Sequence, residues 1–263
     1  TAALLADVST ANAAPGKNIF TGTTNALTFD DASDLDYFTS SGFNSVSIEA
    51  TTDIYGTSNS ALKLVVPGTT AGNQIAPYLR AGFETPMDRP IAALFDFNDK
   101  YLAFSWGAGN TGYIDNGWNA NKNYNVRKTN AATSTATSLT ALKIDFLVAA
   151  TTWTPQTNYM DNVAVIPYYK VTYDMPEGTD VVRYTLAEED GNGNIALTMT
   201  ADGAISGFAT SYTVDETVAP SSGLNATFLG WALKDAPTEV VTSVALENKD
   251  IVLVPVYEVN TAP

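Results

Sequence analysis

Aromatic and amide side chains that could hold a sugar gather in the segment SWGAGNTGYIDNGWNANKNYN, residues 105–125. A sugar ring has apolar C–H faces and a rim of hydroxyl groups. Binding it therefore requires a flat aromatic face beside amide or carboxylate hydrogen-bond partners. The segment holds two tryptophans, two tyrosines and six asparagines, and a loop of this length is uncommon unless it has a function. The composition favours a site for a neutral sugar chain.

The predicted ligand contacts all carry an aromatic ring or a hydrogen-bonding group. They are Trp106, Trp118, Tyr113, Tyr124, Lys122, Asp115 and Asn119, with Trp153 in a second polar stretch. Trp106 also closes an alternating apolar strand, which makes burial in the core an equal alternative. Trp118 has no apolar neighbours at strand spacing, and this favours ligand contact. Gln74, Tyr78 and Arg80 of NQIAPYLR are further candidates for the rim of a cleft.

The residues available for catalysis are few, because the chain contains neither histidine nor cysteine. This excludes Ser-His-Asp and Cys-His catalysis, and also imidazole and thiolate metal sites. A glycosidase can work with two carboxylates alone. Asp96 and Asp99 lie close together in FDFND, but their spacing is typical of turn and edge charges and no general acid accompanies them. We therefore expect no enzyme activity, with a glycosidase as the alternative.

Composition restricts the partners further. Of 263 residues, 45% are hydrophobic and 16% are charged, which is typical of a chain that packs a globular core. Acidic residues outnumber basic ones 28 to 13, giving a net charge of −15 that repels nucleic acid and anionic membranes. No apolar run has transmembrane length, so we expect no membrane insertion. Neutral ligands and divalent cations suit such a surface.

Most apolar segments alternate with period two between clusters of Gly, Asn, Asp, Ser and Thr, which predicts an all-β protein. We expect an antiparallel, jelly-roll-like β-sandwich followed by a smaller β-rich domain. The expected strands of the sandwich are 25–29, 45–50, 61–66, 91–97, 100–106, 141–149 and 160–167. A short helix is expected at residues 3–14, and DGNGN at 190–194 reads as a hairpin turn. The predicted divisions are an N-terminal tail at 1–21, the sandwich at 22–168 and the small domain at 169–263.

Three segments of the first part occur in an order that points to a known family: LTFDD at 27–31, SNSALKLVV at 58–66 and YMDNVAV at 159–165. Together they resemble the β-sandwich carbohydrate-binding modules attached to bacterial polysaccharide-degrading proteins. The resemblance covers roughly residues 22–168 and implies non-catalytic binding of a polysaccharide or oligosaccharide.

Asp161 poses a separate question. In a regular strand it shares a face with Val163 and Val165, so a strand that buries the two valines would also bury a carboxylate. In the family that the first part resembles, this aspartate helps to hold a structural calcium ion. The resemblance implies a Ca²⁺ site formed by Asp30, Asp31 and Asp161, since calcium takes six to eight oxygen ligands. The alternatives are an edge position that faces solvent, or a β-bulge at the start of the strand.

The second part resembles the small β repeats of bacterial surface proteins, of the Listeria–Bacteroides type. The matching segments are YKVTYDM at 169–175, FLGWAL at 228–233 and IVLVPVYE at 251–258. This chain departs from the repeat in having MPEG where a Gly-Gly turn is usual, and in its longer middle. The resemblance implies a spacer without a ligand, with Trp231 in the core.

The context of the chain is inferred from its ends and composition. STANAAPGKN at 9–18, the absence of cysteine and the strong acidity favour a secreted bacterial cell-surface protein, joined to further modules through VNTAP. The expected ligand is a neutral polysaccharide. Trp106 and Trp118 suggest a curved pocket, which favours an α-glucan such as starch. Xylan or another β-glycan is one alternative, and a structural protein or adhesin without a glycan ligand is the other.

Overall fold

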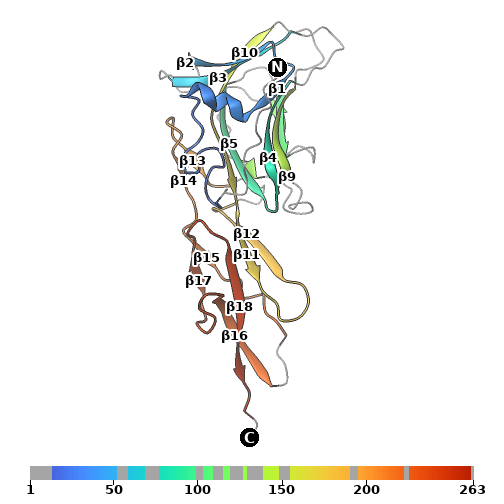
Figure 1. Ribbon diagram of the computed structural model, residues 1–263, viewed down its shortest axis with the longest axis vertical. Coiled ribbons are helices and arrows are strands. Elements are labelled where there is room, and N and C mark those ends of the chain that lie inside the picture. Colours follow the sequence, from blue (N-terminus) through green and yellow to red (C-terminus); the bar gives the residue numbers. More distant parts are fainter. Residues whose placement is uncertain are drawn as a thin grey trace.

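Almost all of the regular structure is β, as the computed structural model shows (Figure 1). The structure describes residues 14–51, 59–68, 77–98, 103–108, 115–118, 127–128, 139–147, 155–189, 195–221 and 225–261. A short 3-10 helix, η1 (Ala32–Tyr37), precedes the first strand. No helix in these ranges is both long and apolar enough to span a membrane.

Two five-stranded antiparallel sheets form the first part. One sheet has the order β1-β4-β9-β6-β7, with β1 (Thr39–Ser41), β4 (Tyr78–Met87), β9 (Leu139–Leu147), β6 (Ala103–Ala108) and β7 (Asp115–Trp118). The other has the order β2-β3-β10-β5-β8, with β2 (Ser45–Thr51), β3 (Asn59–Val66), β10 (Gln156–Pro167), β5 (Ile91–Asn98) and β8 (Arg127–Lys128). The predicted fold class, a β-sandwich followed by a smaller β-rich part, is confirmed.

The main core lies between the two sheets. Leu79 and Ile144 come from the first sheet, Leu62 and Val165 from the second, and each is at most 1% exposed. Because side chains alternate between the faces of a strand, every second residue enters this core. Burial of these apolar faces is the main term that stabilises the sandwich.

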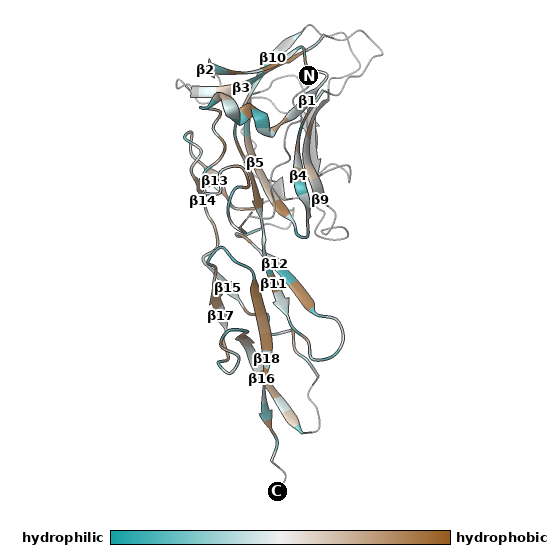
Figure 2. Ribbon diagram, in the orientation of Figure 1, coloured by the Kyte–Doolittle hydropathy of each residue, from teal (hydrophilic) through white to brown (hydrophobic). Residues whose placement is uncertain are grey.

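Strand β5 is buried on both faces, which explains its unbroken apolar run IAALF (Figure 2). Ile91 and Phe95 face the main core. Ala92 and Leu94 face the other way, into a second apolar cluster. That second cluster also contains Ala164 and Ile166 of β10, and Leu186, Ile195, Leu197 and Ile205 from the second part of the chain.

The second part is built on a four-stranded sheet of order β12-β11-β18-β16, in which only β11 and β18 are parallel. Its strands are β11 (Tyr169–Tyr173), β12 (Val181–Thr185), β16 (Ala226–Leu233) and β18 (Ile251–Val259). Two small ladders accompany it: β13 (Thr198–Met199) with β14 (Ile205–Ser206), and β15 (Ser211–Thr213) with β17 (Ser243–Ala245). Trp231 is 2% exposed and meets Tyr173 edge-on at 5.0 Å between ring centroids, so its predicted place in the core is confirmed.

The longer middle of the second part explains how the two parts join. Residues 186–189 and 195–205 lie over the outer face of β5 and β10 through the second apolar cluster. Polar contacts add to this: the Arg89 guanidinium donates to both carboxylate oxygens of Asp250 at 2.6 and 2.8 Å. Arg89 also donates to the carbonyl of Tyr168 at 3.2 Å. The sequence boundary near residue 168 is therefore a place of extensive contact in space.

The N-terminal segment 14–21, placed in a tail by the sequence analysis, runs along β10. The backbone N–H of Ile19 donates to the carbonyl of Val165 at 2.9 Å, and that of Gly16 to Pro167 at 3.0 Å. Asn18 is fully buried, and its Oδ1 accepts from the backbone N–H of Val165 at 3.0 Å. These contacts make the segment part of the sandwich.

Several local expectations differ from the structure. Residues 25–29 do not form the expected strand. Asn25 and Leu27 each make one isolated β-bridge, and Phe29 leaves the extended conformation with a positive φ of 56°. Strand β4, Tyr78–Met87, was not among the expected strands. The expected turn at 190–194 and nearly all of the expected helix at 3–14 lie outside the described residues.

Candidate functional site

The second part of the chain covers one of the two outer faces of the sandwich, whereas the other is buried at Gly82 and its partner Ala141, which is 0% exposed. The face of β5 and β10 is covered by residues 186–189 and 195–205. In Figure 1, β4 and β9 lie on the side of the sandwich away from β13 and β14. The outer face of the sheet β1-β4-β9-β6-β7 is therefore the broad surface on which a large ligand can be sought.

Two rows of mainly polar residues cross this sheet in register. The first row runs through Ser41, Tyr78, Asp145, Ser105 and Asn116, one residue from each strand. The second runs through Thr39, Arg80, Lys143 and Gly107. With neighbouring strands about 4.8 Å apart, a row over five strands spans roughly 19 Å.

Tyr78 and Arg80 show which way these rows face. They alternate along β4 with Leu79 and Ala81, which are 1% exposed and belong to the main core. Tyr78 and Arg80 are half-buried and lie on the opposite face. A phenol and a guanidinium in neighbouring rows supply a ring face and a planar set of donors, which are the groups that a sugar ring and its hydroxyls require.

The aromatic segment predicted from the sequence adjoins the same sheet. Trp106 lies in β6, where its cross-strand partners are Ile144 and Asp115. Trp118 lies in β7 and pairs with Ala103, three positions before Trp106. Because this offset is odd, the two tryptophans do not belong to one cross-strand row. Tyr113, Asn119, Lys122, Tyr124 and Trp153 lie outside the described residues.

Asp161 lies at a β-bulge, which was one of the alternatives to a calcium site in the sequence analysis. The register between β10 and β5 shifts between Asp161 and Ala164, and Asn162 has a positive φ of 53°. Asp161 is 1% exposed, and its Oδ1 accepts from the backbone N–H of Asn162 at 2.8 Å. The extra residue resolves the conflict of faces, since Val163 and Val165 enter the core past the bulge.

The predicted calcium ligands have other partners. Asp31 caps η1, because its Oδ1 accepts from both the backbone N–H and the hydroxyl of Ser33 at 2.9 Å. These hydrogen bonds lower the pKa of the Asp31 carboxyl. Asp30 accepts from the hydroxyl of Thr28 at 2.9 Å. Among the described residues no group of three or more acidic side chains is placed to hold a metal ion, and the calcium site at Asp30, Asp31 and Asp161 stays a prediction.

Asp96 is the cross-strand partner of Asp161, a pairing that the sequence analysis did not anticipate. It is 1% exposed, and its Oδ2 accepts from the side-chain amide of Asn162 at 2.9 Å. Burial raises the pKa of Asp96 to about 6, and the amide of Asn162 opposes this rise. The same amide donates to the carbonyl of Ala201 in the second part, so Asp96 lies at the junction and away from the open face.

The sequence suggested Tyr78 and Arg80 only as residues at the rim of a cleft, not as residues on the outer face of a sheet. The signal that was available is the alternation in YLRAGF, with Leu79, Ala81 and Phe83 as its apolar positions. Their partners in the rows come from β9, β6 and β7, which are distant in sequence. Only the strand order brings these positions together.

No protein-family model and no curated protein matches the sequence. Among solved structures, the chain is similar to a family 28 carbohydrate-binding module specific for non-crystalline cellulose, with 14% identity over 55% of this chain and 94% of that one, and a TM-score of 0.35. A family 61 module in complex with β-1,4-galactotriose gives 8% identity over 49% and 88%, with a TM-score of 0.34.

An exo-β-agarase is similar over 54% of this chain and 25% of its own, with 12% identity and a TM-score of 0.37. This chain thus matches about a quarter of that enzyme's length. Similarities at these levels carry no conclusion about a ligand.

Proposed function

We propose that the sandwich binds a neutral polysaccharide on the outer face of the sheet β1-β4-β9-β6-β7, without catalysis. The observation that carries the proposal is the pair of polar rows on the one broad face that the second part leaves open. The register places residues of hydroxyl, amide and charged type in the same rows as Tyr78, and residues of these types can hydrogen-bond to a sugar or stack on it.

The described part of the aromatic segment lies in β6 and β7, which are neighbours at one end of this sheet. Residues 109–114 connect β6 to β7, the two strands at one end of the sheet, and residues 119–126 follow β7. The segment that the sequence singled out for sugar contact is therefore anchored at the edge of the polar rows. A ligand that crosses the sheet along a row would end beside it.

The shape of the rows bears on the kind of glycan. The α-glucan expectation depended on Trp106 and Trp118 acting as one curved pair, and the register does not align them. A straight path of roughly 19 Å suits an extended chain better than a helical turn. We therefore put an extended β-linked glycan first and an α-glucan such as starch second.

Affinity electrophoresis tests the proposal directly. The protein is run through native gels that contain β-glucan, xylan, mannan, soluble starch or glycogen, each with and without EDTA. We expect retardation in one of the first three gels. Retardation only by starch or glycogen would make an α-glucan the first candidate ligand. No retardation in any gel would favour the alternative of an adhesin without a glycan ligand.

Variants on the open face locate the site. Tyr78→Ala and Arg80→Ala should abolish or strongly reduce retardation, and Trp118→Ala should reduce it if the adjoining segment takes part. Arg183→Ala removes a half-exposed guanidinium from the second part and serves as the matched control. Equal retardation of the Arg80 and Arg183 variants would place the site elsewhere.

Two further parts of the proposal have their own tests. The protein is proposed to be non-catalytic, and release of new reducing ends from any retarding polysaccharide would overturn this. It is also proposed to act as a secreted bacterial cell-surface protein. Cleavage of the native protein by protease added to intact cells would support that location.

A further inference from the structure

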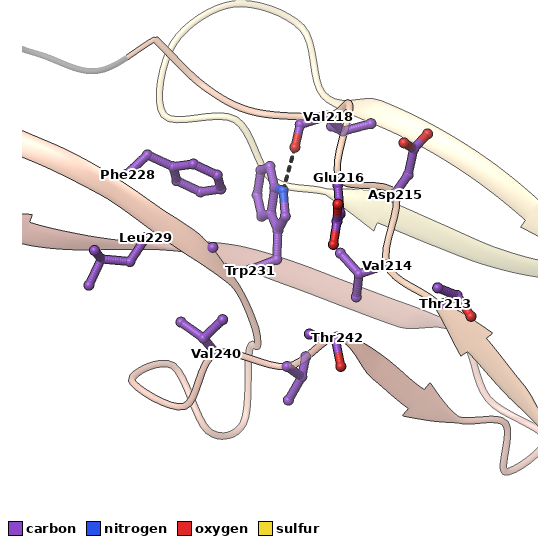
Figure 3. A pocket seen from close by; sticks show the side chains of 12 residues that line it. Thr213, Val214, Asp215, Glu216, Val218, Phe228, Leu229, Trp231, Val240 and Thr242 are labelled. Atoms are coloured by element: carbon purple, nitrogen blue, oxygen red, sulfur yellow. Dashed lines mark hydrogen bonds between the residues drawn. The ribbon is translucent and has the colours of Figure 1, made fainter.

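A hollow in the second part lies between the segment 213–218, strand β16 and the segment 240–242. Its volume is about 720 Å³. Phe228 and Trp231 lie beside each other in it, with ring centroids 5.4 Å apart (Figure 3). The Trp231 indole N–H donates to the carbonyl of Val218 at 2.6 Å, which fixes the ring against the wall.

Most of the lining is apolar, and its charged residues are all acidic. Asp215 and Glu216 line the hollow, and no lysine or arginine does so. Asp215 is engaged by the hydroxyl of Thr217 at 2.6 Å and by Arg183 at 3.4 Å. Glu216 makes no hydrogen bond or ion pair with any residue that the structure describes, so its carboxylate is available to a partner.

Two large hydrophobic side chains are exposed at this hollow. Leu229 is 51% exposed and Val240 is 47% exposed, and both line it. Of the described residues, Val259 alone is a further exposed large hydrophobic side chain. Exposed apolar groups that gather beside a hollow mark a surface for contact with another molecule.

Strand β16 is the edge of its sheet, and half of that edge is open. Its far end is paired, because the N–H of Val241 donates to the carbonyl of Trp231 at 2.8 Å and Ala232 bridges to Val240. No described segment pairs with the outer edge at residues 226–229. An open edge presents backbone N–H and C=O groups to which an extended chain can add.

We propose that this hollow and the open edge of β16 receive an extended segment of a protein partner that carries apolar side chains next to lysine or arginine. An apolar side chain of the partner covers Leu229 and Val240 and enters the hollow. A neighbouring cation meets Glu216. Charge selects this occupant. The only charged groups in the lining are carboxylates, and a chain of net charge −15 repels an acidic partner.

Fluorescence anisotropy of the full chain with a labelled Gly-Lys-Val-Lys-Val-Lys-Val-Gly peptide tests the proposal at physiological ionic strength. We expect saturable binding, and no binding of the peptides in which Glu replaces Lys or Ser replaces Val. Leu229→Ser and Glu216→Lys should each weaken binding by on the order of tenfold.

Two matched controls separate this surface from general attraction to an acidic protein. Glu177→Lys changes the same charge in an exposed turn, and Val259→Ser removes an apolar group that is 74% exposed and outside the hollow. Both should leave binding unchanged.

Three results would overturn the proposal. Equal loss in the Glu216 and Glu177 variants would mean that only net charge attracts the peptide. Failure of the wild-type chain to bind the peptide would exclude this class of partner. Self-association that Leu229→Ser abolishes, without peptide binding, would identify a second copy of this chain as the occupant.

Discussion

The side-chain amide of Asn162 lies 2.9 Å from the Asp96 carboxylate and donates a hydrogen bond to it. The same amide donates to the carbonyl of Ala201, 3.1 Å away in the second part of the chain. One residue at the bulge of β10 thus holds a buried acid of the sandwich and the turn that packs upon it. The stability of this junction should depend on the protonation of Asp96.

Asp96 should make the protein more stable in mild acid than at neutral pH. Because burial raises its pKa from 3.8 to about 6, the folded state holds the proton more tightly than the unfolded state does. Its contribution to the free energy of unfolding is therefore full below about pH 4 and is lost as the pH rises through about 6, on the order of 3 kcal/mol in total. Urea unfolding between these pH values measures the slope, and Asp96→Asn should flatten it. Identical slopes in the two proteins would contradict this account.

Arg89→Ala should loosen the junction. The Arg89 side chain is 14% exposed and makes two hydrogen bonds to Asp250 and one to the backbone of Tyr168. We expect a loss of about 1–3 kcal/mol in the free energy of unfolding, and only partial recovery with Arg89→Lys, because an ammonium cannot reproduce the two-pronged contact. Lys63→Ala, which breaks the exposed pair with Glu49, should change the free energy of unfolding little. A comparable cost for both variants would refute a special role for Arg89.

Gly207→Ala should be far more costly than Gly178→Ala. Both glycines have positive φ, of 99° and 84°, so each alanine carries a backbone cost of about 1–2 kcal/mol. At Gly207 a Cβ would also collide with the backbone carbonyl of Ala196, whereas nothing lies near a Cβ at Gly178. Thermal unfolding should show a difference of at least about 2 kcal/mol between the two variants. Equal melting temperatures would show that the segment covering β5 adjusts freely.

Asp31→Ala should lower the melting temperature of the protein through loss of the cap of η1. If Asp31 acts only as a cap, this cost is the same in EDTA and in millimolar calcium. Asp36→Ala, in the same helix, should change little and serves as the control. A cost that appears only with calcium would instead support the metal site suggested by the family resemblance.

Local patterns in the sequence determined the fold class. Period-two alternation marked strands such as 45–50, because each residue's face depends on its own position in the strand, and an apolar run marked 91–97. FLGWAL marked Trp231 as a core residue, since apolar neighbours at strand spacing indicate burial. The clash between Asp161 and the valines after it was enough to suggest a bulge, which is also a local feature.

Only the tertiary structure decided which surface could bind a ligand. The outer face of β5 and β10 is covered by residues 186–189 and 195–205, and the contacts with β5 join segments about a hundred residues apart. The rows through Tyr78 and the pairing of Asp96 with Asp161 follow from strand order and register between distant strands. Alternation assigns each residue to one of two faces, but it does not state what lies against that face. That depends on contacts between segments far apart in sequence, whose pattern no short stretch of the chain contains.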